Sequence, residues 1–167
     1  MAERAVLARV RRDGRYDVDR SRWGGTNQAL TAVLAGAPPG RLPDVTWRRW
    51  QTAITFPALV DSLDYLSTSL CYRVADETTA FLACWFGLPL VDESAHRTAG
   101  ALVAVHSTDD ARRIRRRFRR LKGALADALV AGLLPATAVP FVLVRWVAGL
   151  ADRETHLSAP FRTLTEP

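Results

Sequence analysis

The amino-acid sequence predicts an α+β fold in which an antiparallel sheet of about five strands has helices packed on one face. Two observations carry this prediction. Short segments of alternating or continuous apolar residues, typical of strands, recur before residue 107, and a later segment has the apolar spacing of an amphipathic helix. With 49% hydrophobic and 24% charged residues, the composition is that of an ordinary globular protein. We expect residues 1–167 to form a single domain.

The first half of the chain predicts two hairpins and two short helices. Alternating apolar residues predict a hairpin over 6–18 that turns at "RDGR". A helix over 26–34 ends at "GAPPG", because proline cannot continue a helix. A loop is predicted over 41–56. A second helix over 57–66 precedes a second hairpin, which turns at 76–78.

The second half predicts one more strand and a long helix. "AGALVAVH", residues 99–106, has the composition of a strand. Ser107 or Thr108 caps a long basic amphipathic helix near 108–133. An irregular conformation is considered for the tail from about residue 152.

Residues 128–150 are apolar enough to suggest a membrane span. This segment is interrupted, however, by Pro135, Pro140 and Arg145, and a membrane-spanning helix would not be expected to contain such residues near its centre. We therefore expect no membrane span, and a final helix or strand over 138–150.

The two cysteines, Cys71 and Cys84, lie in apolar segments on either side of the turn "ADETT". No CxxC pair or histidine-rich cluster accompanies them, so they are expected to be reduced, buried, and on adjacent strands of one hairpin. The start of the chain has no apolar segment followed by a small-residue cleavage site. A cytoplasmic location is the expectation.

The positive charge of the protein is concentrated in "ARRIRRRFRRLKGAL", residues 111–125. Seven arginines occupy nine consecutive positions there, and the segment holds the only lysine of the chain. Eight positive charges against Asp109 and Asp110 give residues 109–122 a net charge of +6, which equals the net charge of the whole protein. The other residues together are neutral.

On a helix this segment has two faces. The apolar residues, which repeat at spacings of three and four and are expected to pack against the sheet, are Ile114, Phe118, Leu121, Leu125 and Leu129. The arginines spread over the remaining face, where like charges at i,i+3 and i,i+4 repel one another by about 0.2–0.5 kcal/mol per pair. A solvated face that serves only solubility mixes both signs of charge. A face that violates local rules in this way is typical of a functional site.

The favoured interpretation is a small, non-enzymatic nucleic-acid or ribonucleoprotein-binding protein whose arginine-rich helix contacts phosphates. RNA or the ribosome is the expected partner, because phosphates and shape suffice to bind RNA without reading bases. An acidic protein, an anionic membrane surface, or a merely solvated face screened by salt are the alternatives. The predicted nucleic-acid-binding residues are Arg112, Arg113, Arg115, Arg116, Arg117, Arg119, Arg120, Lys122, Arg48, Arg49 and Arg22.

Arg22, Arg48 and Arg49 belong to this set because they adjoin tryptophans, in "SRWGG" and "TWRRWQ". Arginine beside tryptophan suits stacking on bases together with phosphate contact. Tryptophans that face a partner are sought among Trp23, Trp47 and Trp50, whereas Trp85 and Trp146 are expected in the core.

Signatures of catalysis or cofactor binding are missing: no P-loop, GxGxxG, HExxH, GxSxG or zinc-ligand pair occurs. No cofactor and no metal are expected. The remaining hypotheses are a small enzyme that holds an anionic substrate such as a nucleotide, and a structural subunit of an assembly. The polar residues considered for chemistry and interpreted as ordinary ones are His96, His106, His156, Asp61, Asp64, Glu77 and Asp92.

Three segments, "RAVLARVRRDGRYDVDRSRWGG", "CYRVADETTAFLACWFGL" and "GALVAVHSTDDARRIRRRFRRLKGAL", resemble a family of uncharacterised proteins from haloarchaea. The resemblance covers most of the chain through features of the fold rather than of chemistry, and it implies no activity and no catalytic residues. Members of that family tend to have histidine before the Trp-Gly pair, where this chain has Arg22. The resemblance also implies a salt-rich cytoplasm in which most protein surfaces are acidic, so that a basic patch is conspicuous.

Overall fold

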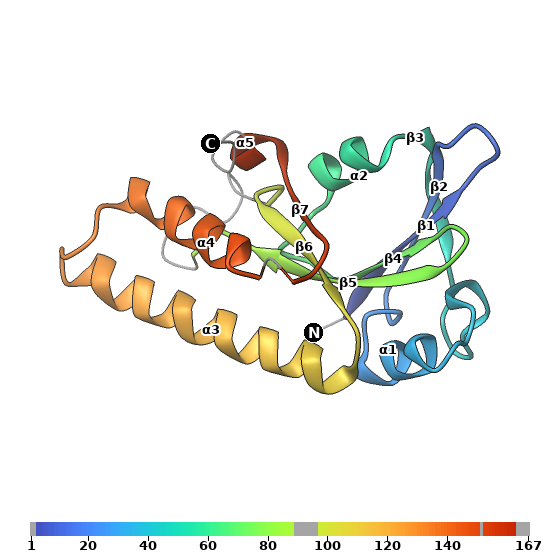
Figure 1. Cartoon of the computed structure of the whole chain (residues 1–167), viewed down its shortest axis with the longest axis horizontal. Helices are drawn as coiled ribbons and strands as arrows, with labels where there is room; N and C mark the ends of the chain where they lie inside the picture. Colours follow the sequence, from blue (N-terminus) through green and yellow to red (C-terminus); the bar gives the residue numbers. More distant parts are fainter. Residues whose placement is uncertain (1–2, 89–96, 151, 163–167) are drawn as a thin grey trace.

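The computed structural model describes residues 3–88, 97–150 and 152–162, and shows an α+β fold built on a seven-stranded sheet (Figure 1). The strands are β1 (Arg4–Val10), β2 (Tyr16–Ser21), β3 (Arg48–Ile54), β4 (Thr68–Val74), β5 (Thr78–Trp85), β6 (Gly100–Val105) and β7 (Thr155–Leu157). The helices are α1 (Asn27–Leu34), α2 (Phe56–Ser62), α3 (Thr108–Val130), α4 (Val139–Ala148) and α5 (Ala159–Arg162), with short 3₁₀ helices at Pro39–Arg41 and Ala136–Ala138.

The sheet is mixed rather than antiparallel. Its strand order is β3-β2-β1-β4-β5-β6-β7, and β1 runs parallel to β4 while all other neighbours are antiparallel. The prediction of an antiparallel sheet was wrong because hairpin signals report only pairs of strands that follow each other in sequence. The β1–β4 pair joins strands that are separated in sequence by β2, α1, β3 and α2, and no local pattern predicts it.

Two strands lie where none was predicted. β3 falls inside the predicted loop over 41–56, and its residues, "RRWQTAI", are exposed or only half-buried, so they lack the alternation that marks a half-buried strand. β7 lies in the tail and has three residues, too few for a detectable period. Both are edge strands of the sheet, where one side of the backbone has no partner strand.

The sheet buries both of its faces. On β1, Ala5 and Leu7 belong to one apolar cluster, while Val6 and Ala8 belong to the other. Because side chains alternate along a strand, both clusters need a covering layer. The prediction of helices on one face is therefore corrected.

The helices divide between these two faces (Figure 1). α1, α3 and α4 cover the first, contributing among others Leu30, Phe118 and Leu143. α2 covers the second with Phe56 and Leu59, which pack beside the strands' apolar side chains. α2 is shorter than the predicted helix over 57–66, since it ends at Ser62.

α3 has the capping and the apolar stripe that the sequence predicts. Ser107 is its N-cap, with Oγ accepting a hydrogen bond from Asp110 N at 3.0 Å. The helix ends at Val130, before Gly132, whose φ of +70° suits glycine and lets the next N–H bond back to Ala128. Residues 139–148 then form α4, which is a helix rather than a strand and returns beside α3 (Figure 1).

Cys71 and Cys84 are free and buried, on the adjacent strands β4 and β5 of one hairpin, as predicted. They do not face each other, because Cys71 belongs to the cluster beneath α2 and Cys84 to the cluster beneath α3. Burial raises the pKa of each thiol to about 12.

We expect both thiols to resist labelling in the folded protein, because only about one thiol in 10⁴ is ionised at pH 8 when the pKa is about 12, and the thiolate is the reactive form. Mass spectrometry after treatment with iodoacetamide should show no adduct in buffer and two in guanidinium chloride. Labelling of either cysteine within minutes in buffer would contradict the burial.

Candidate nucleic-acid interface

A buried ion pair fastens the first turn of α3 to the rest of the molecule. The Asp110 carboxylate accepts hydrogen bonds from Arg153 Nη1 at 2.6 Å, from Arg113 Nη2 at 2.7 Å and from His106 N at 3.3 Å. The side chains of Asp110 and Arg153 are 8% and 9% exposed. Burial alone would raise the pKa of the Asp110 carboxyl, but the two arginines hold it below its usual value. The start of the basic helix is thus fixed in orientation.

α1 supports the same turn from the side. Thr31 Oγ1 lies 2.9 Å from Thr108 Oγ1, and Arg115 Nη1 donates to Asn27 Oδ1 at 2.8 Å. The apolar stripe completes the attachment, with Ile114 and Phe118 buried against the sheet. α3 therefore presents a rigid outer face.

The exposed arginines of α3 differ in whether an acid neutralises them. Arg112 pairs with Asp109 at 3.1 Å, and Arg113 pairs with Asp110 at 2.7 Å. Four exposed arginines have no ion pair with any residue that the structure describes: Arg116, Arg117, Arg119 and Arg120. These four residues, called the arginine face below, lie about two to three turns beyond the acids.

Arg115 and Lys122, which were also predicted to bind nucleic acid, turn toward the protein. Lys122 Nζ donates to the carbonyl of Trp85 at 3.1 Å and lies 4.2 Å from the centre of the Trp85 ring. Burial lowers the pKa of Lys122 to about 8, and burial likewise lowers the pKa of Arg115. Both residues follow a buried residue of α3 by four positions, which places them at the edge of the apolar stripe. We leave both out of the arginine face.

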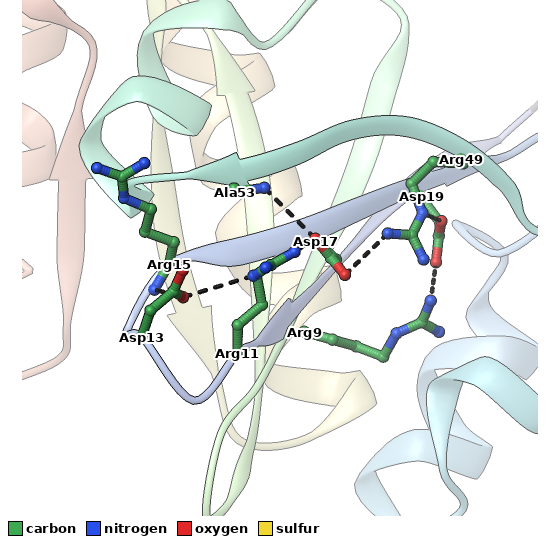
Figure 2. A network of polar contacts seen from close by, with 8 residues as sticks. All are labelled: Arg9, Arg11, Asp13, Arg15, Asp17, Asp19, Arg49 and Ala53. Atoms are coloured by element: carbon green, nitrogen blue, oxygen red, sulfur yellow. Dashed lines mark hydrogen bonds and ion pairs between the residues drawn. The ribbon is translucent and has the colours of Figure 1, made fainter.

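Arg49 is engaged in a network of ion pairs on β1, β2 and β3 (Figure 2). Its Nε lies 2.7 Å from Asp19 Oδ1, and its Nη1 lies 3.0 Å from Asp17 Oδ2. Arg9 also pairs with Asp19, and Arg11 with Asp17. The guanidinium groups of Arg9, Arg11 and Arg49 each face a carboxylate, so Arg49 is not available to a phosphate.

Arg22 and Arg48 lie together in a hollow that Arg4 and Arg20 also line, and α3 contributes no residue to this lining. Sequence reasoning missed Arg4 and Arg20 because neither belongs to a cluster along the chain. The register of β2 and β3, in which Arg20 lies opposite Arg48, brings them together.

The tryptophans differ in their exposure and in the groups that they contact. Trp23 is 54% exposed and borders this hollow. Trp47 donates its indole N–H to Pro39 O at 2.9 Å, and Trp50 lies beneath the Arg20 guanidinium. Trp85 and Trp146, which were expected in the core, are only partly buried. Trp85 packs against the cluster beneath α2, and Trp146 packs beside Phe118 in the cluster beneath α3.

The carboxylates singled out in the sequence do not gather. Asp61 pairs with Arg162, and Asp64 pairs with Arg97. Across residues 3–88, 97–150 and 152–162, no group of three His, Cys, Asp or Glu side chains could hold a metal ion. Asp92 and His96 lie outside the described residues. In the same part of the chain no helix is long and apolar enough to cross a membrane.

Replacing Asp110 by Ala is expected to lower the free energy of unfolding by about 3 kcal/mol at pH 7, because it leaves the buried Arg153 charge without its partner. Asp109→Ala is the matched control: it removes an acid from the same helical turn, but the side chain is 90% exposed, and the loss should stay below about 1 kcal/mol. Urea unfolding measures both.

Because the folded pKa of Asp110 is depressed, the contribution of this carboxylate to the free energy of unfolding is present at neutral pH and should disappear as the pH falls below about 4. Equal losses in the two variants would contradict this role.

One comparison with known proteins gives a match. The model of a family described as "Family of unknown function (DUF6735)" matches residues 40–157. The match includes β3 to β7 and all of α3, and therefore Arg48 and the arginine face. It leaves out the first hairpin, with Arg4, Arg20 and Arg22. No curated protein and no solved structure matches the chain.

Proposed function

The chain belongs to this family of unknown function, and from the geometry of α3 we propose that it is a non-enzymatic protein that binds nucleic acid through backbone phosphates. The observation that carries the proposal is the unneutralised arginine face. Arg116, Arg117, Arg119 and Arg120 are exposed on a rigid helix and have no acidic partner among the residues described.

The cost of this arrangement supports a ligand. Arg116 and Arg120 are four positions apart, and Arg116–Arg119 and Arg117–Arg120 are three apart, so three pairs of like charges repel on the helix surface. Together they disfavour the free protein by about 1 kcal/mol at low salt. A polyanion that lies along the face replaces this repulsion with attraction.

The geometry favours phosphate contact over base reading. From Arg116 to Arg120 the helix rises about 6 Å. This length matches a short stretch of nucleic-acid backbone rather than an extended surface. Guanidinium groups bind phosphate oxygens through two parallel hydrogen bonds. Contacts of this kind position a protein on a nucleic acid without selecting a sequence.

The proposed partner is RNA in the cytoplasm, within a ribosome or another ribonucleoprotein. RNA helices are bound largely through shape, phosphates and 2′-hydroxyls, which suits a face without base-reading side chains. The haloarchaeal source that the resemblance implies fits this proposal, since concentrated salt would screen the repulsion within the arginine face in the free protein. The same salt would demand several simultaneous contacts for binding.

Replacing all four residues of the arginine face by Gln should weaken binding to RNA by a similar factor for every sequence tested, because phosphate contacts carry no sequence information. Each lost contact should lower the slope of log affinity against log salt by about 0.7–0.9, and four should lower it by about 3. Fluorescence anisotropy with labelled RNA between about 50 and 200 mM salt measures this slope.

The matched control removes the same charge elsewhere, with four exposed arginines that lie outside α3 replaced by Gln: Arg12, Arg15, Arg41 and Arg145. This variant should keep most of the wild-type slope. Equal losses in the two variants would mean that net charge alone drives binding, and absence of binding by the wild type near 100 mM salt would refute the proposal.

A further inference from the structure

A second group of arginines surrounds a hollow of about 440 Å³ at one end of β1, β2 and β3, and α3 contributes no residue to its lining. Its cationic lining comes from four exposed arginines: Arg4, Arg20, Arg22 and Arg48. Asp44 is the one acid in that lining. The hollow therefore carries an excess of three positive charges.

The arginines are close enough to repel one another. Arg20 lies directly opposite Arg48 in the β2–β3 ladder, where like charges destabilise the pair of strands. Desolvation lowers the pKa of Arg20, the charge of Asp64 raises it, and the neighbouring charge of Arg4 lowers it. Arg20 is held in place by the Trp50 ring, whose centre lies 3.0 Å from its Cζ.

The ion-pair network shows that the same three strands can also place acids beside arginines. The fold therefore does not require the excess positive charge of the hollow. Arg48 and Arg49 are neighbours on β3 and point to opposite faces of the sheet. Arg49 meets Asp17 and Asp19 (Figure 2). Arg48, in contrast, lies opposite Arg20 in the ladder. One face of these strands is neutralised, and the other is left positive.

The loop that carries Arg22 and Trp23 is fixed from both sides. Gly24 N donates to Ser21 Oγ at 2.9 Å, and Gly24 O accepts from Tyr72 Oη at 2.8 Å. Gly25 N donates to Glu3 O at 2.9 Å, and a Cβ at position 25 would lie 2.6 Å from the Arg4 carbonyl oxygen. The exposed Trp23 ring is thus held above the hollow by a rigid backbone.

A second hollow, of about 400 Å³, adjoins the first and shares Trp23 and Asp44 with it. Its lining is mostly apolar, with Ala29, Leu42 and Val45 on its wall. Thr26 and Gln28 add polar groups at its border. A cationic compartment and an apolar compartment therefore meet at an exposed tryptophan.

We propose that these two hollows form a binding site for a nucleoside phosphate, with the phosphate among Arg4, Arg22 and Arg48 and the base stacked on Trp23. The site is separate from the arginine face and does not depend on its function. Guanidinium forks match a phosphate dianion in geometry and charge. The indole ring offers a flat surface to any base, and the apolar wall excludes water from its other edge.

Binding of the four ribonucleoside 5′-monophosphates tests the site through the quenching of Trp23 fluorescence and, independently, through calorimetry. We expect at least one of them to bind, and the corresponding nucleoside and inorganic phosphate each to bind at least tenfold more weakly, because each fills only one compartment. Phosphate that binds as tightly as the nucleotide would overturn the proposal, since it would define a simple anion site. Failure of all four to bind at 1 mM would do the same.

Two substitutions separate the compartments. Arg48→Gln should weaken nucleotide binding at least tenfold and weaken nucleoside binding little, since it removes a charged hydrogen-bond donor. Trp23→Ala should weaken both about tenfold by removing the stacking surface. Arg22→Gln, in a loop whose backbone bonds do not use this side chain, repeats the first test should Arg48→Gln fail to fold.

Arg12→Gln is the charge-matched control, on the β1–β2 turn, and should bind the nucleotide like the wild type. Stability gives a further readout: Arg48→Gln relieves the repulsion with Arg20, so the free protein should melt at the same temperature as the wild type or slightly above it. A nucleotide affinity unchanged by Arg48→Gln, or equally reduced by Arg12→Gln, would overturn the assignment of the phosphate compartment.

Two further binding measurements distinguish a nucleotide unit within a nucleic acid from a free nucleotide. A short oligoadenylate that quenches Trp23 more strongly than AMP indicates a unit of single-stranded nucleic acid, whereas tighter binding of AMP indicates a free nucleotide. In either case the affinity for the ligand must fall in the Arg48→Gln variant. The variant with four glutamines in the arginine face should keep full nucleotide binding, so that failure of the α3 interface and failure of this site are distinguishable.

Discussion

The parallel pairing of β1 with β4 is the constraint on which the rest of the structure depends. It joins the unit β3-β2-β1 to the unit β4-β5-β6-β7 and places β1 inside the sheet, with both faces buried. Two covering layers are then required, so α2 lies on one face while α1, α3 and α4 lie on the other. The network of Figure 2 and the arginine-lined hollow both involve residues of β1, β2 and β3.

The arginines of the protein fall into two groups according to their neighbours. Those next to acids, such as Arg49 and Arg153, hold strands and helices together through ion pairs with carboxylates. Those of the arginine face, and those around the hollow, are exposed and lie close to like charges. Repulsion of this kind opposes folding, and the structure concentrates it in these two regions.

Sequence reasoning succeeded where the information is local. The stripe of α3, its cap at Ser107 and the buried cysteines follow from spacing and from residue type within a few positions. β3 escaped because an edge strand with half-exposed residues has no alternation to detect, and β7 because it is so short. The inward turn of Lys122 could have been found, since it lies four residues after Phe118 and therefore beside the stripe. The meeting of Arg20 with Arg48 could not, because it depends on the register between two strands, one of which was not predicted.

The glycine pair at positions 24 and 25 has a consequence for recognising related proteins. A side chain at position 25 would collide with backbone atoms of Glu3 and Arg4, so this position requires glycine while the loop keeps its path. A side chain at position 24 would meet the side chains of Ser21 and Trp47, which would have to move. Because the family match begins at residue 40, the pair also marks a part of the chain that the family model does not describe. Searching genomes for a Trp-Gly-Gly loop after a basic hairpin would therefore separate chains that can build the hollow from those that share only the later strands and the long helix.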